Sequence, residues 1–269
     1  MLEIIEPLTQ NRKPLKAILF DFDGTLSTLR SGWEAVMSDL MHEILIPEKG
    51  DRVSGQSDMA EKIATYIDTS TGIQTIFQMQ WLAEQVRAAG RQPLDPWDYK
   101  AEYNRRLMQT VSQRRAAVSS GREQAERFMV AGSRAFLESL RKRDLQMYVA
   151  SGTDQADVVA EARILGLDTF FKEIVGAPPG QARCSKELVV RRLLSVSGLQ
   201  GEELAVIGDG KVEIGIAREA GAIALGLAAD EVTRSGVNPD KRRRLIAAGA
   251  QAITGDFLEP EELLEWMAI

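Results

Sequence analysis

The stretch Leu15-Lys-Ala-Ile-Leu-Phe-Asp21, followed at once by Phe22-Asp23-Gly24-Thr25, decides the fold of this chain. A short apolar run that ends at a carboxylate and is followed by a glycine predicts a buried strand and then a turn. Asp21 and Asp23 would lie together just beyond the strand, where their mutual repulsion costs free energy unless a cation lies between them. Gly24 allows the backbone to turn sharply and to approach a ligand. The alternative is an ordinary strand-end turn whose acids face water.

The pattern of the chain changes twice after this turn. Residues 31–129 carry apolar side chains at helical spacing and show no strand alternation, so we expect an all-helical segment. Further on, short apolar runs such as Leu204-Ala-Val-Ile-Gly-Asp209 alternate with helical stretches. This order predicts an α/β fold, in which a parallel sheet has helices on both faces. The expected division is a core of residues 1–29 and 130–269, with a helical unit of residues 30–129 inserted into it.

Polar residues end three of the predicted strands, at Asp21, Ser151 and Asp209. Because ligands bind at the carboxyl edge of an open parallel sheet, we expect these side chains to converge on one site. Asp209 and Glu213 lie four residues apart around a predicted helix start, and hard oxygen ligands of this kind suit Mg²⁺. Alternatively, Glu213 only complements the helix dipole. Ser151 and the backbone N–H groups after it predict an anion site, with simple helix capping as the alternative.

A lysine beside clustered carboxylates and a phosphate would neutralise charge and orient a nucleophile. Lys186 stands at a predicted helix start, between Ser151 and Asp209 in the sequence. Lys172 and Lys211 are rivals for this place, and only the order of the elements favours Lys186. The alternative is an ordinary solvated lysine.

The four motifs, taken in this order, resemble those of the haloacid dehalogenase (HAD) superfamily of phosphohydrolases. They are Asp21-Phe-Asp-Gly-Thr25, Ser151-Gly152, Lys186 and Gly208-Asp-Gly-Lys-Val-Glu213. The resemblance covers the two parts of the predicted core. In position and helical character, the inserted segment is similar to the C1-type cap of phosphoglycolate phosphatase-like members. The resemblance implies a Rossmann-like parallel sheet core with an inserted all-helical cap domain.

The resemblance also implies a role for each of these residues. Asp21 would be the nucleophile that forms an aspartyl phosphate, and Asp23 would act as general acid and then as general base. Ser151, the Gly152 amide and Lys186 would bind the phosphoryl oxygens. The second Asp of the first motif is similar to that of the phosphate-transferring members and argues against cleavage of a carbon–halogen bond.

A magnesium ion is the cofactor that the resemblance implies. Its ligands would be the Asp21 carboxylate, the backbone carbonyl of Asp23, Asp209 and Glu213, the last directly or through water. Glu213 stands where Asp is common in the family. Lys186 lacks the proline that often follows this lysine in capped relatives.

Three further residues are candidate substrate contacts. Arg30 follows the first motif closely and could pair with a second anionic group on the substrate. The alternative is a solvated hinge arginine. Gln74 lies in the polar stretch Thr69-Ser-Thr-Gly-Ile-Gln-Thr75, which predicts either a specificity loop or ordinary helix capping. Thr25, at the end of the first motif, is the third.

The composition narrows the classes of function. The chain has 269 residues, one histidine, one cysteine and a net charge of −6. These counts exclude a multi-histidine zinc site and an intrachain disulfide, and the acidic balance gives no general attraction to nucleic acid. The basic run Lys241-Arg-Arg-Arg244 predicts a solvated helix face. An acidic N-terminus and the lack of a long apolar stretch predict a cytoplasmic protein that does not bind membranes.

Together these observations lead to one functional hypothesis, a Mg²⁺-dependent phosphatase that acts on a small phosphorylated metabolite. Phosphoglycolate or a sugar phosphate would be typical substrates. The first alternative is a phosphomutase of the β-phosphoglucomutase type, which uses the same aspartyl phosphate. The second is a non-catalytic binding protein on the same fold. We expect a monomer or a homodimer.

Overall fold

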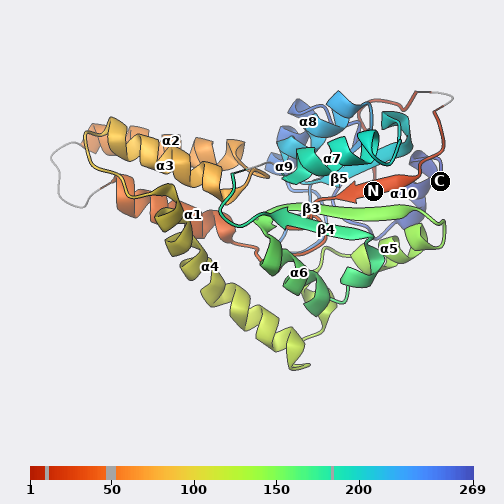
Figure 1. The fold of residues 1–269 in the computed structure, drawn as a ribbon, viewed down its shortest axis with the longest axis horizontal. Helices are drawn as coiled ribbons and strands as arrows, with labels where there is room; N and C mark the ends of the chain where they lie inside the picture. The colour runs from red at the N-terminus through yellow and green to blue at the C-terminus, as the bar shows by residue number, and fades with distance from the viewer. Residues whose placement is uncertain (10–11, 47–52, 183–184) are drawn as a thin grey trace.

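A seven-stranded sheet forms the centre of the molecule (Figure 1). The computed structural model describes residues 1–9, 12–46, 53–182 and 185–269. The strands lie in the order β1-β7-β6-β5-β2-β3-β4. Their bounds are Glu3–Ile4 for β1, Ala17–Phe20 for β2, Gln146–Asp154 for β3, Glu173–Ala177 for β4, Leu204–Gly208 for β5, Ile223–Leu227 for β6 and Ala252–Thr254 for β7. The predicted strand before Asp21 is β2, with β3 and β5 as its parallel neighbours.

Helices cover both faces of the sheet, as predicted. Ile18 and Phe20 of β2 belong to the apolar core on one face, and Ala17 and Leu19 belong to the core on the other. A strand that is buried on both faces needs this continuous apolar run. One face carries α5 (Ser133–Arg141), α6 (Gln155–Ile164) and α10 (Pro260–Trp266); the other carries α7 (Ser185–Ser195), α8 (Lys211–Ala220) and α9 (Pro239–Ala247) (Figure 1). Short 3₁₀ helices lie at Ala125–Phe128, Asp168–Phe170 and Gly201–Glu203.

The edge strand β1 was not expected from the sequence. It pairs with β7 in antiparallel orientation, with Glu3 opposite Ile253 and Ile4 opposite Ala252. The predicted parallel sheet therefore carries one short antiparallel strand at this edge. Two residues are too few to show an alternating pattern, so the pairing is set by the neighbouring strand and not by a local signal.

The helical segment forms a separate layer beside the sheet (Figure 1). Its helices are α1 (Trp33–Leu45), α2 (Val53–Thr69), α3 (Thr75–Ala88) and α4 (Pro96–Ser119). They pack around a core of their own, to which α1 contributes the predicted stripe of Met37, Leu40, Met41 and Leu45. Asp95 caps α4 by accepting a hydrogen bond of 2.8 Å from the Trp97 amide. None of the helices in the described ranges is long and apolar enough to cross a membrane.

The two connections between the helical segment and the sheet run side by side. Ser27 and Met129 form an antiparallel bridge, and the Thr28 amide donates to the Phe128 carbonyl at 2.9 Å. Arg114 of α4 donates to two carbonyl oxygens of the first connection, those of Leu29 at 2.7 Å and Ser31 at 2.9 Å. The helical segment is thus inserted into the α/β unit through a paired double linker.

Candidate active site

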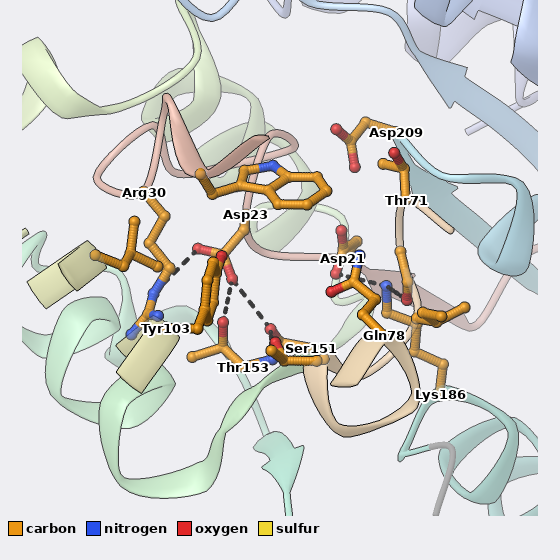
Figure 2. A pocket seen from close by; sticks show the side chains of 16 residues that line it. Asp21, Asp23, Arg30, Thr71, Gln78, Tyr103, Ser151, Thr153, Lys186 and Asp209 are labelled. Atoms are coloured by element: carbon orange, nitrogen blue, oxygen red, sulfur yellow. Dashed lines mark hydrogen bonds and ion pairs between the residues drawn. The ribbon is translucent and has the colours of Figure 1, made fainter. Parts of the chain in front are cut away.

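Three adjacent strands bring the predicted polar residues to one edge of the sheet. Asp21 and Asp23 follow β2, Ser151 lies in β3, and Asp209 follows β5. The chain order reverses between β2 and β5, which is the place where open α/β sheets bind ligands. All four residues line one cavity of about 90 Å³, together with Gly152 (Figure 2).

Lys186 enters this cavity from α7. Its Nζ lies 3.0 Å from Asp21 Oδ1, also contacts the Glu213 carboxylate, and donates to the Gly72 carbonyl oxygen at 3.1 Å. The two rival lysines lie elsewhere. Lys172 donates to Gln146, and Lys211 is exposed at the start of α8. The structure therefore brings Lys186, and neither rival, to Asp21.

Asp21 is 5% exposed and lies among like charges. Burial raises the pKa of Asp21 to about 7; Lys186 opposes this rise, whereas the neighbouring Asp209 and Asp23 add to it. Burial alone would raise the pKa of Asp21, but the described lining also carries three carboxylates, those of Asp21, Asp23 and Asp209, against two cations, Arg30 and Lys186. A bound cation would relieve that excess.

Asp23 is held by two hydroxyl groups from β3. Its Oδ2 accepts hydrogen bonds from Ser151 Oγ at 3.2 Å and from Thr153 Oγ1 at 2.8 Å (Figure 2). Residues two apart on a strand share a face, so both hydroxyls reach the same oxygen. Asp23 Oδ1 lies 3.9 Å from Arg30 Nε. The guanidinium of Arg30 in turn donates two hydrogen bonds to Glu161, of 3.1 and 2.7 Å.

The helical segment provides the remaining walls of the cavity. The wall residues are Trp33 of α1, Thr71, Gly72 and Ile73 of the loop between α2 and α3, Thr75 and Gln78 of α3, and Tyr103 and Leu107 of α4. Two candidate substrate contacts lie outside this lining. Gln74 lines a smaller cavity of about 60 Å³ that shares Gly72, Ile73, Gly152 and Lys186 with the main one. Thr25 is fully buried.

The sequence matches the family model of the haloacid dehalogenase-like hydrolases over residues 15–221. The chain belongs to this family. The match confirms the resemblance seen in the motifs and shows an enzyme, which sets aside a non-catalytic binding protein. A comparison with curated proteins gives no match by sequence.

Several solved structures are similar to this HAD-like hydrolase. A predicted phosphoglycolate phosphatase from Haemophilus somnus 129PT is 17% identical with a TM-score of 0.61, covering 93% of this chain and 97% of that one. A predicted phosphatase from Clostridium acetobutylicum is 17% identical with a TM-score of 0.60, covering 94% of this chain and 100% of that one. A β-phosphoglucomutase from Clostridium difficile is 15% identical with a TM-score of 0.57, covering 94% of this chain and 97% of that one. These likenesses confirm the predicted fold class.

The acids of this HAD-like hydrolase fit a hard divalent cation. Among the described residues, no three Asp, Glu, His or Cys side chains form a ready metal-binding group. Mg²⁺ needs only one or two protein carboxylates, because it keeps several waters. Asp21 and Asp209 offer that number on one cavity wall, and the charge excess around Asp21 favours a cation there. Glu213 contacts Lys186, so its place in the ligand set stays a prediction.

Lys241 is a site residue that the sequence analysis missed. Its Nζ lies 2.7 Å from Asp209 Oδ2 and 2.7 Å from Glu231 Oε1, and the residue is only 7% exposed. The prediction of a solvated face for the basic run is therefore wrong for this residue. The sequence spacing could have indicated that Lys241 is buried, because it lies one helical turn before the fully buried Leu245 on the inner face of α9.

Gly24 is required by the packing of Asp209. Its φ of +74° is a left-handed conformation, and a Cβ built there would lie 2.2 Å from Asp209 Oδ2. We expect Gly24→Ala to cost about 1–3 kcal/mol more stability than Gly90→Ala, because it adds an overlap to the shared backbone strain. Gly90 is the matched control, since its φ is +73° and a Cβ built there would have no described atom outside its own chain neighbours within 4 Å. Urea unfolding of both variants measures the difference, and equal costs would contradict the role given to Asp209.

Glu34 of α1 makes the stability depend on pH. Burial, and then repulsion from Glu231, raises the pKa of Glu34 to about 7 from the ordinary 4.5. Because the pKa of Glu34 is higher in the folded than in the unfolded protein, the free energy of unfolding falls as pH rises from about 4.5 to 7. Glu34→Gln should therefore stabilise the protein at pH 8 by about 1–2 kcal/mol and have little effect at pH 4.5. This value is smaller than the full pKa shift implies, because solvent screens the partly exposed Glu34 side chain.

Denaturant unfolding at the two pH values, with EDTA present, checks this expectation. Asp39→Asn is the control, since Asp39 lies on the same helix and is not buried. A gain for Glu34→Gln that is equal at both pH values would show that ionisation of Glu34 is not its source.

Proposed function

We propose that this HAD-like hydrolase is a Mg²⁺-dependent phosphatase that hydrolyses a small phosphorylated metabolite, of the phosphoglycolate or sugar-phosphate kind, through an aspartyl phosphate. The observation that carries the proposal is the pairing of Asp21 with Lys186 at 3.0 Å in a cavity that Asp23 also lines. A binding site alone does not need a buried carboxylate and a second, separately held carboxylate beside it.

In the first step, a carboxylate oxygen of Asp21 attacks phosphorus, and the bond from phosphorus to the ester oxygen breaks. Lys186 offsets negative charge on the phosphoryl oxygens, and the Gly152 amide donates a hydrogen bond to them. The Ser151 hydroxyl, which donates to Asp23 in the structure, turns to donate to them when substrate is bound. Asp23 delivers a proton to the departing alkoxide. The Asp23 Oδ2 atom accepts a hydrogen bond from Thr153 Oγ1, so Oδ1 is the oxygen left to carry the proton.

In the second step, Asp23 takes a proton from water, which attacks the phosphorus of the aspartyl phosphate. The bond from phosphorus to Asp21 breaks, and inorganic phosphate leaves with the carboxylate restored. The carboxylates of Asp21 and Asp209 and the backbone carbonyl of Asp23, with Glu213 directly or through water, would hold Mg²⁺, whose chemistry is to neutralise charge on the transferring group. Without it the acids would repel an anionic substrate.

The helical segment serves as the cap in this proposal. Residues 30–129 close over the sheet edge and exclude water while the aspartyl phosphate forms. The direct contact of the Gly72 carbonyl with Lys186, at 3.1 Å, supports this role, because it joins the cap to the group that binds phosphate.

The test is phosphate release from a panel of small phosphate monoesters, with Mg²⁺ and then with EDTA. We expect turnover of at least one ester with Mg²⁺ and a loss of at least about 100-fold in EDTA, since a metal ion contributes several kcal/mol to such reactions. Net release of phosphate without added bisphosphate separates a phosphatase from a phosphomutase. No turnover of any ester with Mg²⁺ would contradict the proposal.

A further inference from the structure

The lining of the cavity contains side chains of different chemistry. Lys186, Ser151 and Gly152 bind the phosphoryl group in the proposed function. The other walls carry apolar or neutral polar side chains, which the substrate's leaving group must face. They are Trp33, Thr71, Ile73, Thr75, Gln78, Tyr103 and Leu107.

The cationic side chains of the described lining already pair with carboxylates of the protein. Among the described residues that line the cavity, Arg30 and Lys186 are the cationic ones. Lys186 contacts the carboxylates of Asp21 and Glu213, and it binds the phosphoryl group in the proposed function. Among the described lining residues, this leaves Arg30 as the cation that could bind a second anionic group on the substrate.

Arg30 is surrounded by carboxylates. It is 8% exposed, donates two hydrogen bonds to Glu161, and lies 3.4 Å from Asp157 and 3.9 Å from Asp23. The single positive charge of Arg30 is shared among the carboxylates of Glu161, Asp157 and Asp23, so little net positive charge is left to attract a substrate anion. A carboxylate brought near these acids would also be repelled by them.

The size of the cavity limits the leaving group as well. Its volume is about 90 Å³. An engineered cavity of about 150 Å³ holds one benzene molecule. Once a phosphoryl group is in place, little of this volume is left, which favours a small leaving group.

We infer that the substrate is the phosphate ester of a small, uncharged alcohol, of the polyol or short-chain sugar class. A carboxylate-bearing ester such as phosphoglycolate, or a bisphosphate, is then a poor substrate. This inference rests on the proposed function and narrows its substrate class. The neutral hydroxyl groups of such an alcohol can hydrogen-bond to Thr71, Thr75 and Gln78, and its carbon atoms can pack against Trp33 and Leu107.

The test compares two matched pairs of esters. They are 2-hydroxyethyl phosphate with 2-phosphoglycolate, and glycerol 3-phosphate with 3-phosphoglycerate. Within each pair a CH₂OH group replaces a carboxylate, so size is nearly constant and charge differs. We expect kcat/KM to be on the order of 100-fold higher for the neutral member, since a site without a partner for a charged group rejects it strongly.

A charge introduced into the wall gives a second, independent measurement. Thr75 is half-buried at the start of α3, so a longer side chain can be accommodated there. Thr75→Arg supplies a cation with no carboxylate partner, which the described wall residues do not offer, and should narrow the neutral-to-anionic ratio of kcat/KM at least about tenfold. Thr75→Gln adds length without charge and should leave the ratio near its wild-type value.

The outcomes separate this inference from the proposed function. Phosphate release with equal or higher kcat/KM for the carboxylate esters overturns the inference and leaves the phosphatase proposal standing. A ratio that Thr75→Arg does not change also overturns it, because the missing cation is then not the cause of the preference. Absence of turnover with every ester of the wider panel overturns the phosphatase proposal and the inference with it.

Discussion

Asp21→Asn is expected to reduce phosphate release by about 10⁴- to 10⁶-fold, the range in which the loss of a covalent nucleophile falls. The amide oxygen of asparagine is a far weaker nucleophile than a carboxylate, and it cannot form the aspartyl phosphate. Asparagine has nearly the shape of aspartate, so the packing around Lys186 and Asp209 should survive. The measurement is kcat with Mg²⁺ on the best ester of the panel.

Control measurements distinguish loss of the nucleophile from loss of the fold. The variant should retain its circular dichroism spectrum, and Asp58→Asn, an exposed change on α2, should retain wild-type activity. Acid-quenched wild-type protein should carry phosphate on the peptide that contains Asp21. Activity of Asp21→Asn near the wild-type level would show that another group attacks phosphorus.

Much of the candidate site could be predicted from the sequence, because its signals are local. The β2 stretch is a short apolar run with acids at its end, and the runs before Ser151 and Asp209 have the same form. Parallel strands must place these ends at one edge, so three distant motifs predict one site. The structure places β2 between β3 and β5, which is the arrangement this prediction needs.

The residues that hold the site could not be found in this way. Arg30 and Glu161 are 131 positions apart, and Lys241 lies 32 positions from Asp209, so neither pair has a local pattern. Their contacts depend on which turn of a helix faces the sheet edge, a property of the finished packing. Arg30 shows the consequence, because a sequence position beside the first motif suggests a substrate contact, whereas its guanidinium pairs with Glu161.

The linkers and the sheet edge illustrate the same limit. The helical segment is evident from its periodicity, yet the bridge between Ser27 and Met129 that joins its two connections has no sequence signature. The two-residue strand β1 gains its partner only after β7 is in place. Local patterns therefore predict the elements of this hydrolase, and tertiary contacts decide the details that hold the elements together.

Replacing Lys241 is expected to have the largest effect on stability of the changes considered for this molecule. The ammonium lies between two buried carboxylates, those of Asp209 and Glu231, at 2.7 Å from each. Lys241→Met keeps the aliphatic length of the side chain but leaves both acids without that cation. Breaking a buried ion pair by removing one partner costs about 3–5 kcal/mol, so we expect a loss of that size in the free energy of unfolding.

The measurement is urea unfolding in EDTA, so that no bound metal replaces the lost charge. Arg243→Met is the matched control on α9, because Arg243 pairs with Asp240 on the surface, with side chains 77% and 67% exposed. Its cost should be below about 1 kcal/mol. Adding Glu231→Gln to Lys241→Met should recover part of the loss, because one of the two unpaired charges is then removed. If Lys241→Met costs no more than the control, the buried ammonium does not hold Asp209 in place.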